Sequence, residues 1–177
     1  MKEVLIRQEE VRDYNVISSV IKDAFLEEEK SDHLEHELVN ELRRSSAHVP
    51  ELCLVAELDG EIVGHIFFSK ILIKNGFEKH SSLALAPVSV LRHYHKQGIG
   101  SKLIYASHQK ARELGFASII LLGHEDYYPR FGYRRASEFN IRLNFPAPDQ
   151  NVMAIELLPN GLKDIEGVVL YPEAFYN

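Results

Sequence analysis

The chain has 177 residues, a length typical of one domain, and we expect residues 1–177 to form a single domain. Its formal net charge of −6 argues against a general nucleic-acid-binding protein, which would carry a basic stripe. One cysteine, Cys53, excludes an internal disulfide framework and favours a reducing compartment. The first residues lack the apolar core of a signal peptide, and no apolar run approaches the roughly 20 residues of a membrane span. We therefore expect a cytoplasmic protein that binds neither nucleic acid nor a membrane.

The first part of the chain begins with a short predicted strand, Val4 to Arg7, and continues with two helical patterns. Apolar residues recur at intervals of three and four over residues 11–25, and again over residues 32–43. This spacing predicts two amphipathic helices, and Pro50 ends the region.

The middle of the chain has the pattern of strands. Residues 52–58 and 61–73 read as strands, and Asp59-Gly60 between them is a two-residue hairpin signal. Asn75-Gly76 marks a second turn, which precedes a predicted strand over residues 83–91.

The last part of the chain contains the clearest helix, Gly98 to Leu114, which Gly115 terminates. The uninterrupted apolar run over residues 117–122 predicts a fully buried strand, and further strands are expected over 151–158 and 168–171. Hairpin strands followed by one strand–helix–strand crossover predict an α+β fold with a mixed sheet that contains a single parallel pair.

Residues 95–100 read His-Lys-Gln-Gly-Ile-Gly and stand at the junction between a predicted strand and the clearest helix. A helix start carries unpaired N–H groups and the positive end of the helix dipole. Glycines there expose the backbone amides, so the segment suits a phosphate or a pyrophosphate. The chain lacks the Gly-x-x-x-x-Gly-Lys-Ser/Thr pattern, which argues against a P-loop nucleotide-binding protein.

A second motif, Tyr128-Pro129-Arg130-Phe131-Gly132-Tyr133, follows the apolar run. Together the two motifs resemble those of the GCN5-related N-acetyltransferase (GNAT) superfamily, which are Arg/Gln-x-x-Gly-x-Gly/Ala and, further on, Tyr-x-x-x-Gly-Phe/Tyr. The strings Leu85-Ala86-Pro87-Val88-Ser89-Val90 and Leu122-Gly123-His124 are also similar to a bacterial subgroup, the YhbS-like predicted acetyltransferases. The resemblance covers essentially the whole chain.

This resemblance implies the acyl-CoA N-acyltransferase (GNAT) fold, with a central, mostly antiparallel sheet of six to seven strands, one parallel splayed pair and about four helices. It implies acetyl-CoA as cosubstrate, with the pyrophosphate of coenzyme A at the hexapeptide and the pantetheine arm along the strand before it. The residues that the resemblance assigns to cofactor binding are Val88, Ser89, Val90, His95, Lys96, Gln97, Gly98, Ile99, Gly100 and Ser101.

The resemblance makes Tyr128 the general acid that protonates the departing thiolate. The chemistry is suitable, because a phenol with a pKa near 10 is able to protonate a thiolate of slightly lower pKa. The alternative is that Tyr128 has only a packing role, and in that case Tyr127 is the next candidate for the general acid. His124 is the candidate general base, and it has two alternatives: a structural loop histidine, or a chain of waters in place of a base.

Two positions depart from the family pattern, His95 in place of Arg or Gln and Arg92 where many relatives have Pro. The basic cluster around them is either a counter-charge for the phosphates or solvated surface charge; its members are Arg92, His93, His95, Lys96 and Lys102. The acidic run from Asp23 to Glu37 is either a mouth that attracts a cationic amine or a solvated helical face.

His65 and Cys53 are expected to be structural, the first half-buried and the second a small core residue. The nine histidines show no ligand spacing typical of a metal site, so we expect no metal.

The sequence thus predicts an acetyl-CoA-dependent N-acetyltransferase in which a primary amine attacks the thioester directly in a ternary complex. The alternative is a non-catalytic acyl-CoA-binding regulatory module of the same fold. The absence of Arg or Gln at position 95 favours this alternative, and the presence of Tyr128 argues against it. The acceptor amine (a small metabolite, an antibiotic, a peptide or a protein lysine) and the acyl-chain preference stay open. The apolar C-terminal strands leave a homodimer open as well.

Overall fold

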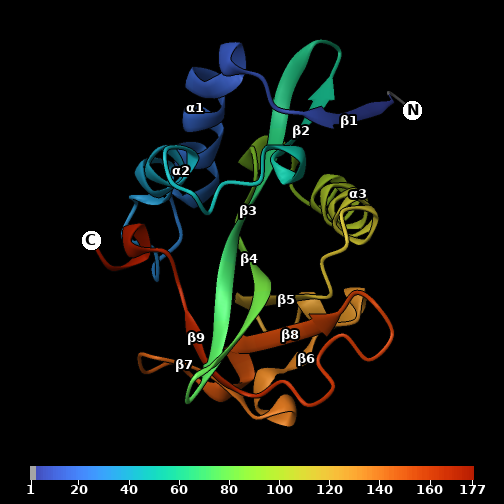
Figure 1. Ribbon diagram of the computed structural model, residues 1–177. Helices are drawn as coiled ribbons and strands as arrows, with labels where there is room; N and C mark the ends of the chain where they lie inside the picture. The colour runs from blue at the N-terminus through green and yellow to red at the C-terminus, as the bar shows by residue number, and fades with distance from the viewer. Residues whose placement is uncertain (1–2) are drawn as a thin grey trace. The chain divides into compact units, whose positions relative to one another are not determined.

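The computed structural model describes residues 3–177 and divides into two compact units, each built from two separate stretches of chain (Figure 1). The first unit holds the described residues up to Phe68 together with Ala86–Lys110, and the second holds Ser69–Leu85 and Ala111–Asn177. The long strands β3 (Glu61–Asn75) and β4 (Glu78–Val90) pass from one unit to the other along their length. Within the described residues, no helix is both long and apolar enough to cross a membrane.

In the first unit, antiparallel pairing joins β1 to β2 and β2 to β3. The turn between β2 and β3 has positive φ at Asp59 and Gly60, 52° and 82°, as a two-residue hairpin with the strand twist requires. The other elements of the unit are α1 (Tyr14–Phe25), α2 (Glu35–Arg43), α3 (Ile99–Glu113), β1 (Val4–Gln8) and β2 (Leu54–Leu58).

Helix α3 lies very close to β3 at Gly64. A Cβ atom at this position would be 3.1 Å from side-chain atoms of Ile99 and Leu103, and 3.2 Å from the carbonyl oxygen of Ser89. Glycine therefore permits the close approach that seats the first turn of α3 against the sheet.

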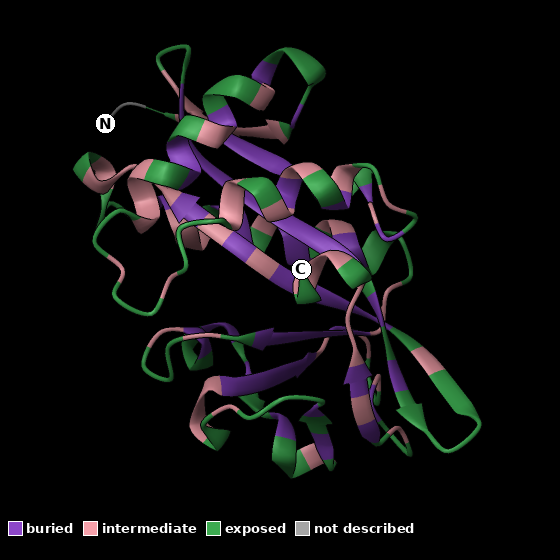
Figure 2. Cartoon of the chain, turned by 90° about the vertical axis from the view of Figure 1, so that its left-hand side faces the viewer, coloured by how far each residue is buried: buried purple, intermediate pink, exposed green. Residues whose placement is uncertain are grey.

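In the second unit, β4 and β5 pair in parallel with the register Leu83↔Ile119 and Ala84↔Ile120. Antiparallel pairing joins β5 to β8 and β8 to β6, and a further parallel ladder joins β7 to β9. The elements are β5 (Ser118–Leu122), β6 (Arg134–Arg135), β7 (Ile141–Leu143), β8 (Val152–Glu156) and β9 (Gly167–Leu170). Most residues of β5 and β8 are buried, whereas both residues of β6 are exposed. Figure 2 shows the burial of each described residue along the chain.

The mixed sheet, the β4–α3–β5 crossover and the predicted helices are confirmed. The described chain has nine strands rather than six or seven, since β6 and β7 are too short to produce a periodic signal. It has three α-helices rather than about four, and its remaining helical pieces are short 3₁₀ turns. Leu52, expected in a strand, closes one of these turns, and the strand begins at Leu54.

A buried carboxylate connects several elements of the first unit. Glu9, directly after β1, accepts hydrogen bonds from Arg43 Nε at 2.9 Å and Arg43 Nη2 at 2.8 Å, and its Oε2 lies 2.8 Å from His65 Nε2. The side chains are 3%, 6% and 0% exposed, in the order Glu9, Arg43 and His65. The Arg43 guanidinium also lies 3.9 Å from the ring centroid of Tyr14, so α1, α2, β1 and β3 are all held by one network.

The protonation states of this network follow from burial and charge. Burial raises the pKa of Glu9, but hydrogen bonds from His65 and Arg43 outweigh that effect and hold the pKa at about 2. Burial lowers the pKa of His65 more than Glu9 raises it, and the positive charge of Arg43 lowers it further. His65 is therefore neutral and donates its Nε2–H to Glu9, while Nδ1, which has no hydrogen-bond partner, carries the lone pair.

We expect Glu9→Ala to lower the free energy of unfolding by about 3–5 kcal/mol, because it leaves the Arg43 guanidinium buried without its counter-ion. Urea denaturation at pH 7.5 measures the change. Glu3→Ala, which removes an exposed carboxylate, is the control and should change stability by less than about 0.5 kcal/mol. An equal, small effect of both substitutions would contradict the importance of the network.

Stability should fall as the pH is lowered below 6.5. The folded pKa of His65 lies below its ordinary 6.5, so under pH 6.5 the unfolded chain binds a proton that the folded chain does not. Glu9 adds to the loss below its ordinary 4.5, down to about 2. Urea titrations between pH 7.5 and 5 should show a slope that is smaller in His65→Gln, with a part retained because burial also lowers the pKa of His48.

Candidate functional site

The segment between β4 and α3 contains two residues in the left-handed region of φ. After the 3₁₀ turn Arg92–Tyr94, both Lys96 and Gly98 adopt left-handed φ values, 61° and 78°. A Cβ atom on Gly98 would meet nothing within 4 Å, so glycine is needed there for its conformation and not for space. Helix α3 begins immediately after Gly98, so the N–H groups of its first turn, which have no partner within the helix, follow these two residues.

His95 is bound to the end of β4. Its Nε2 lies 2.8 Å from the carbonyl oxygen of Val90, and since a carbonyl only accepts, Nε2 carries the hydrogen. The Gln97 side chain donates to the carbonyl oxygen of His93 at 3.4 Å, and Leu91 N donates to Val63 O at 2.9 Å. The residue that departs from the family pattern thus connects the loop to the strand before it.

Arg92, a member of the basic cluster, forms ion pairs with two acidic residues, one in the last turn of α1 and one shortly after that helix. Its guanidinium donates to Glu27 Oε1 at 2.6 Å and to Asp23 Oδ1 at 3.4 Å, and its backbone N donates to Asp23 Oδ2 at 2.8 Å. Its positive charge is therefore balanced within the chain. Lys96 and Lys102 are exposed and are better placed to supply counter-charge to a ligand.

The strand residues before the loop alternate in burial. Val88 and Val90 are half-buried, whereas Ser89 is 1% exposed. The Ser89 hydroxyl has no hydrogen-bond partner, and the Ser89 carbonyl oxygen faces Gly64. The N–H and C=O groups of a strand point sideways in the plane of the sheet, so a ligand that bonds the backbone of this strand approaches its edge.

Tyr128 belongs to the second unit, where it begins the 3₁₀ turn Tyr128–Phe131 that follows β5. Its ring meets Tyr127 edge-on, with 5.1 Å between centroids, and Tyr133 in the same way at 5.7 Å. A Cβ atom on Gly123 would overlap Tyr128 Cε2 and lie 3.0 Å from Cδ2, so the glycine at the end of β5 makes room for this ring. The Gly123 of the predicted motif is thus a steric requirement of Tyr128.

Burial raises the pKa of Tyr128 well above its ordinary value, with a smaller contribution from Tyr127. The phenol is therefore protonated throughout the neutral range, as a proton donor must be. His124 lies in the exposed loop between β5 and the same 3₁₀ turn, where its carbonyl oxygen accepts a hydrogen bond from Tyr127 N at 3.1 Å. The predicted cofactor residues 88–90 and 95–101 lie in the first unit, and His124 and Tyr128 lie in the second.

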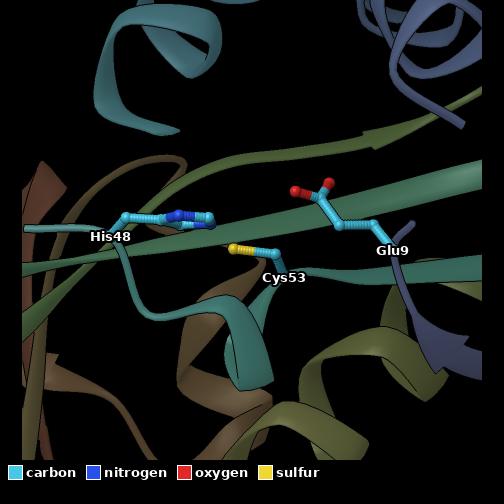
Figure 3. A group of neighbouring side chains, drawn as sticks. All are labelled: Glu9, His48 and Cys53. Atoms are coloured by element: carbon cyan, nitrogen blue, oxygen red, sulfur yellow. The ribbon is translucent and has the colours of Figure 1, made fainter. Parts of the chain in front are cut away.

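One further cluster of metal-ligating residue types was not visible in the sequence. Glu9, His48 and Cys53 bring one possible ligand atom each within 4.8 Å of one another (Figure 3). However, Arg43 already supplies positive charge to both Glu9 oxygens, and burial raises the pKa of the Cys53 thiol, which stays protonated. We therefore interpret the cluster as the surroundings of the buried ion pair, with Cys53 as a core residue.

Comparisons with known proteins identify a family and several relatives. The model of the acetyltransferase (GNAT) family matches residues 16–133. The uncharacterized N-acetyltransferase YhbS of Escherichia coli strain K12 is 29% identical over 154 residues, which cover 86% of this chain and 90% of YhbS. The uncharacterized N-acetyltransferase YjhQ of the same strain is 31% identical over 118 residues, 66% of this chain and 65% of YjhQ.

Two crystal structures of GNAT proteins are similar over nearly their whole length. YhbS from Escherichia coli in complex with CoA has a TM-score of 0.90 and 28% identity, covering 100% of this chain and 94% of that chain. An acetyltransferase from Brucella melitensis in complex with acetyl-CoA has a TM-score of 0.81 and 32% identity, covering 99% of both chains. The fold and its two motifs are those of an acyltransferase. The chain belongs to the GNAT family of acetyltransferases, as the sequence motifs predicted.

Proposed function

We propose that this protein is an N-acetyltransferase that transfers the acetyl group of acetyl-CoA to a primary amine, and that the whole chain acts as one domain. The observation that carries the proposal is the left-handed loop at Lys96 and Gly98, which leads directly into α3. The support from relatives is that the similar proteins from Escherichia coli and Brucella melitensis were crystallised with CoA and acetyl-CoA.

In this proposal the amides of residues 97–101, at the positive end of α3, bind the pyrophosphate of acetyl-CoA, with His95 holding the loop and Lys96 adding charge. The backbone of residues 88–90 bonds the pantetheine arm, and one of its amides polarises the thioester carbonyl. No metal takes part in this scheme.

The proposed reaction is a direct displacement. The amine nitrogen attacks the thioester carbonyl carbon, the C–N bond forms, and the C–S bond breaks through a tetrahedral intermediate. The Tyr128 phenol gives its proton to the departing sulfur, and the proton of the new ammonium leaves to His124 or to water. Holding the two substrates in line supplies a large part of the rate.

Gly100→Asp tests the binding half of the proposal. Gly100 lies in the first turn of α3, where an aspartate adds bulk and negative charge beside the proposed pyrophosphate. We expect the Kd of acetyl-CoA, measured by calorimetry, to rise at least about 100-fold. Gln109→Asp on the exposed side of the same helix should leave the Kd unchanged. Unaltered affinity in Gly100→Asp would refute the loop as the pyrophosphate site.

Tyr128→Phe tests the chemical half. The ring and its packing stay, but the proton donor is lost, so kcat should fall by about 10²-fold or more while the KM for acetyl-CoA changes little. The measurement is thiol release from acetyl-CoA in the presence of a panel of amines, and Tyr127→Phe is the control. Full turnover in Tyr128→Phe would show that another group protonates the thiolate. Tight acetyl-CoA binding with no thiol release from the wild type on any amine would favour the non-catalytic module instead.

A further inference from the structure

Asp23 contacts the start of the proposed cofactor loop from a distant part of the chain. Asp23 lies in the last turn of α1. Its Oδ2 accepts a hydrogen bond from the backbone N of Arg92 at 2.8 Å. Its Oδ1 accepts hydrogen bonds from Nε and Nη2 of the same arginine, both at 3.4 Å. The Asp23 side chain is 33% exposed, so this contact lies at the edge of the interior.

The backbone bond matters because of where Arg92 stands. Arg92 is the first residue of the 3₁₀ turn that leaves β4, a position whose N–H has no partner within the turn. Asp23 supplies the missing acceptor from another helix, in the way that a side chain caps a helix start. Leu91 is extended at this point, with φ −49° and ψ 132°, so the direction in which the chain leaves β4 depends on how residue 92 is held.

The charge of Asp23 does not explain its position. A carboxylate near a site for phosphates repels the ligand, and here it also neutralises an arginine that would otherwise attract it. The neighbouring ion pair between Arg92 and Glu27 contributes little to stability, because the Glu27 side chain is 79% exposed. What remains is geometric: Asp23 holds one end of the loop, and the bond from His95 to Val90 O holds the next part.

We propose that Asp23 is a positioning residue for acetyl-CoA, which fixes residue 92 and thereby presents the amides that follow Lys96 before the ligand arrives. The inference rests on the proposed function of this loop. A loop that is already ordered loses less conformational entropy on binding, so the contribution of Asp23 appears as affinity for coenzyme A and not as a rate of chemistry.

The test is calorimetric titration of coenzyme A into the full chain, supported by thermal melts that show each variant to be folded. Asp23→Ala should raise the Kd about tenfold and raise the KM for acetyl-CoA in parallel, with kcat at saturation unchanged. Asp23→Asn retains an oxygen that accepts the Arg92 N–H, and its Kd should stay within about threefold of the wild type. Glu27→Gln is the control and should bind as the wild type does.

Arg92→Pro provides the rescue. Proline has no N–H, fixes φ and is tolerated at the first position of such a turn, and the extended Leu91 is compatible with a following proline. In the Arg92→Pro background, Asp23→Ala should therefore no longer weaken coenzyme A binding. This double-mutant cycle separates position from the direct repulsion of the ligand by Asp23, because that repulsion would persist in both backgrounds. Asp23→Asn, which removes the charge and keeps an acceptor, separates position from the neutralisation of Arg92.

Three results would overturn the inference: tighter or unchanged binding in Asp23→Ala, a loss in Asp23→Asn as large as in Asp23→Ala, or the same effect of Asp23→Ala with and without proline. If the wild type itself does not bind coenzyme A, the proposed function of the loop fails together with the inference. Wild-type binding that Asp23→Ala leaves intact removes only the inference.

Discussion

The buried pair of Glu9 and Arg43 is the contact on which the arrangement of the first unit depends. Its bonds hold the end of β1 and the end of α2 against His65 on β3, and the guanidinium lies over Tyr14 at the start of α1. The other end of α1 carries Asp23, which holds the loop before α3. A single buried charge pair is thus connected, through one helix, to the segment that we propose binds coenzyme A.

A buried ion pair is a poor source of stability compared with apolar packing, because removing both charges from water offsets most of the attraction. It is directional, however, and an arginine that bonds both oxygens of a carboxylate fixes the relative position of two elements more narrowly than apolar contact does. The Gly64 contact complements it by admitting α3 to the surface of β3. The ion pair thus fixes β1 and α2 against β3, and Gly64 allows Ile99 and Leu103 of α3 to pack on the same strand.

The sequence predicted the features whose signals are local. The Asp59-Gly60 hairpin, the helix after Gly98 and the apolar strand before Gly123 each depend on neighbouring residues, and the structure contains all of them. The strand is not fully buried as expected, because Leu122 at its end is 47% exposed. The sequence did not indicate the hydrogen bonds between Asp23 and Arg92 or between His95 and Val90. No residue near Asp23 marks a partner that is 69 residues away. The sequence offers no steric reason for glycine at positions 64 and 123. The structure shows that α3 packs against Gly64 and that the Tyr128 ring packs against Gly123, so a side chain would be crowded at both positions.

His95 and Arg92, the two departures from the family pattern, have one physical explanation. In a chain of net charge −6, the overall field opposes an anionic cosubstrate, so binding must rely on short-range donors. Arg92 has its charge balanced by Asp23 and Glu27, and His95 uses Nε2 on a backbone carbonyl. Both side chains thus shape the loop, which leaves the backbone amides and the start of α3 as the principal groups of the pyrophosphate site that we propose. In that proposal, affinity depends more on the direction of the amides than on the number of cations around them.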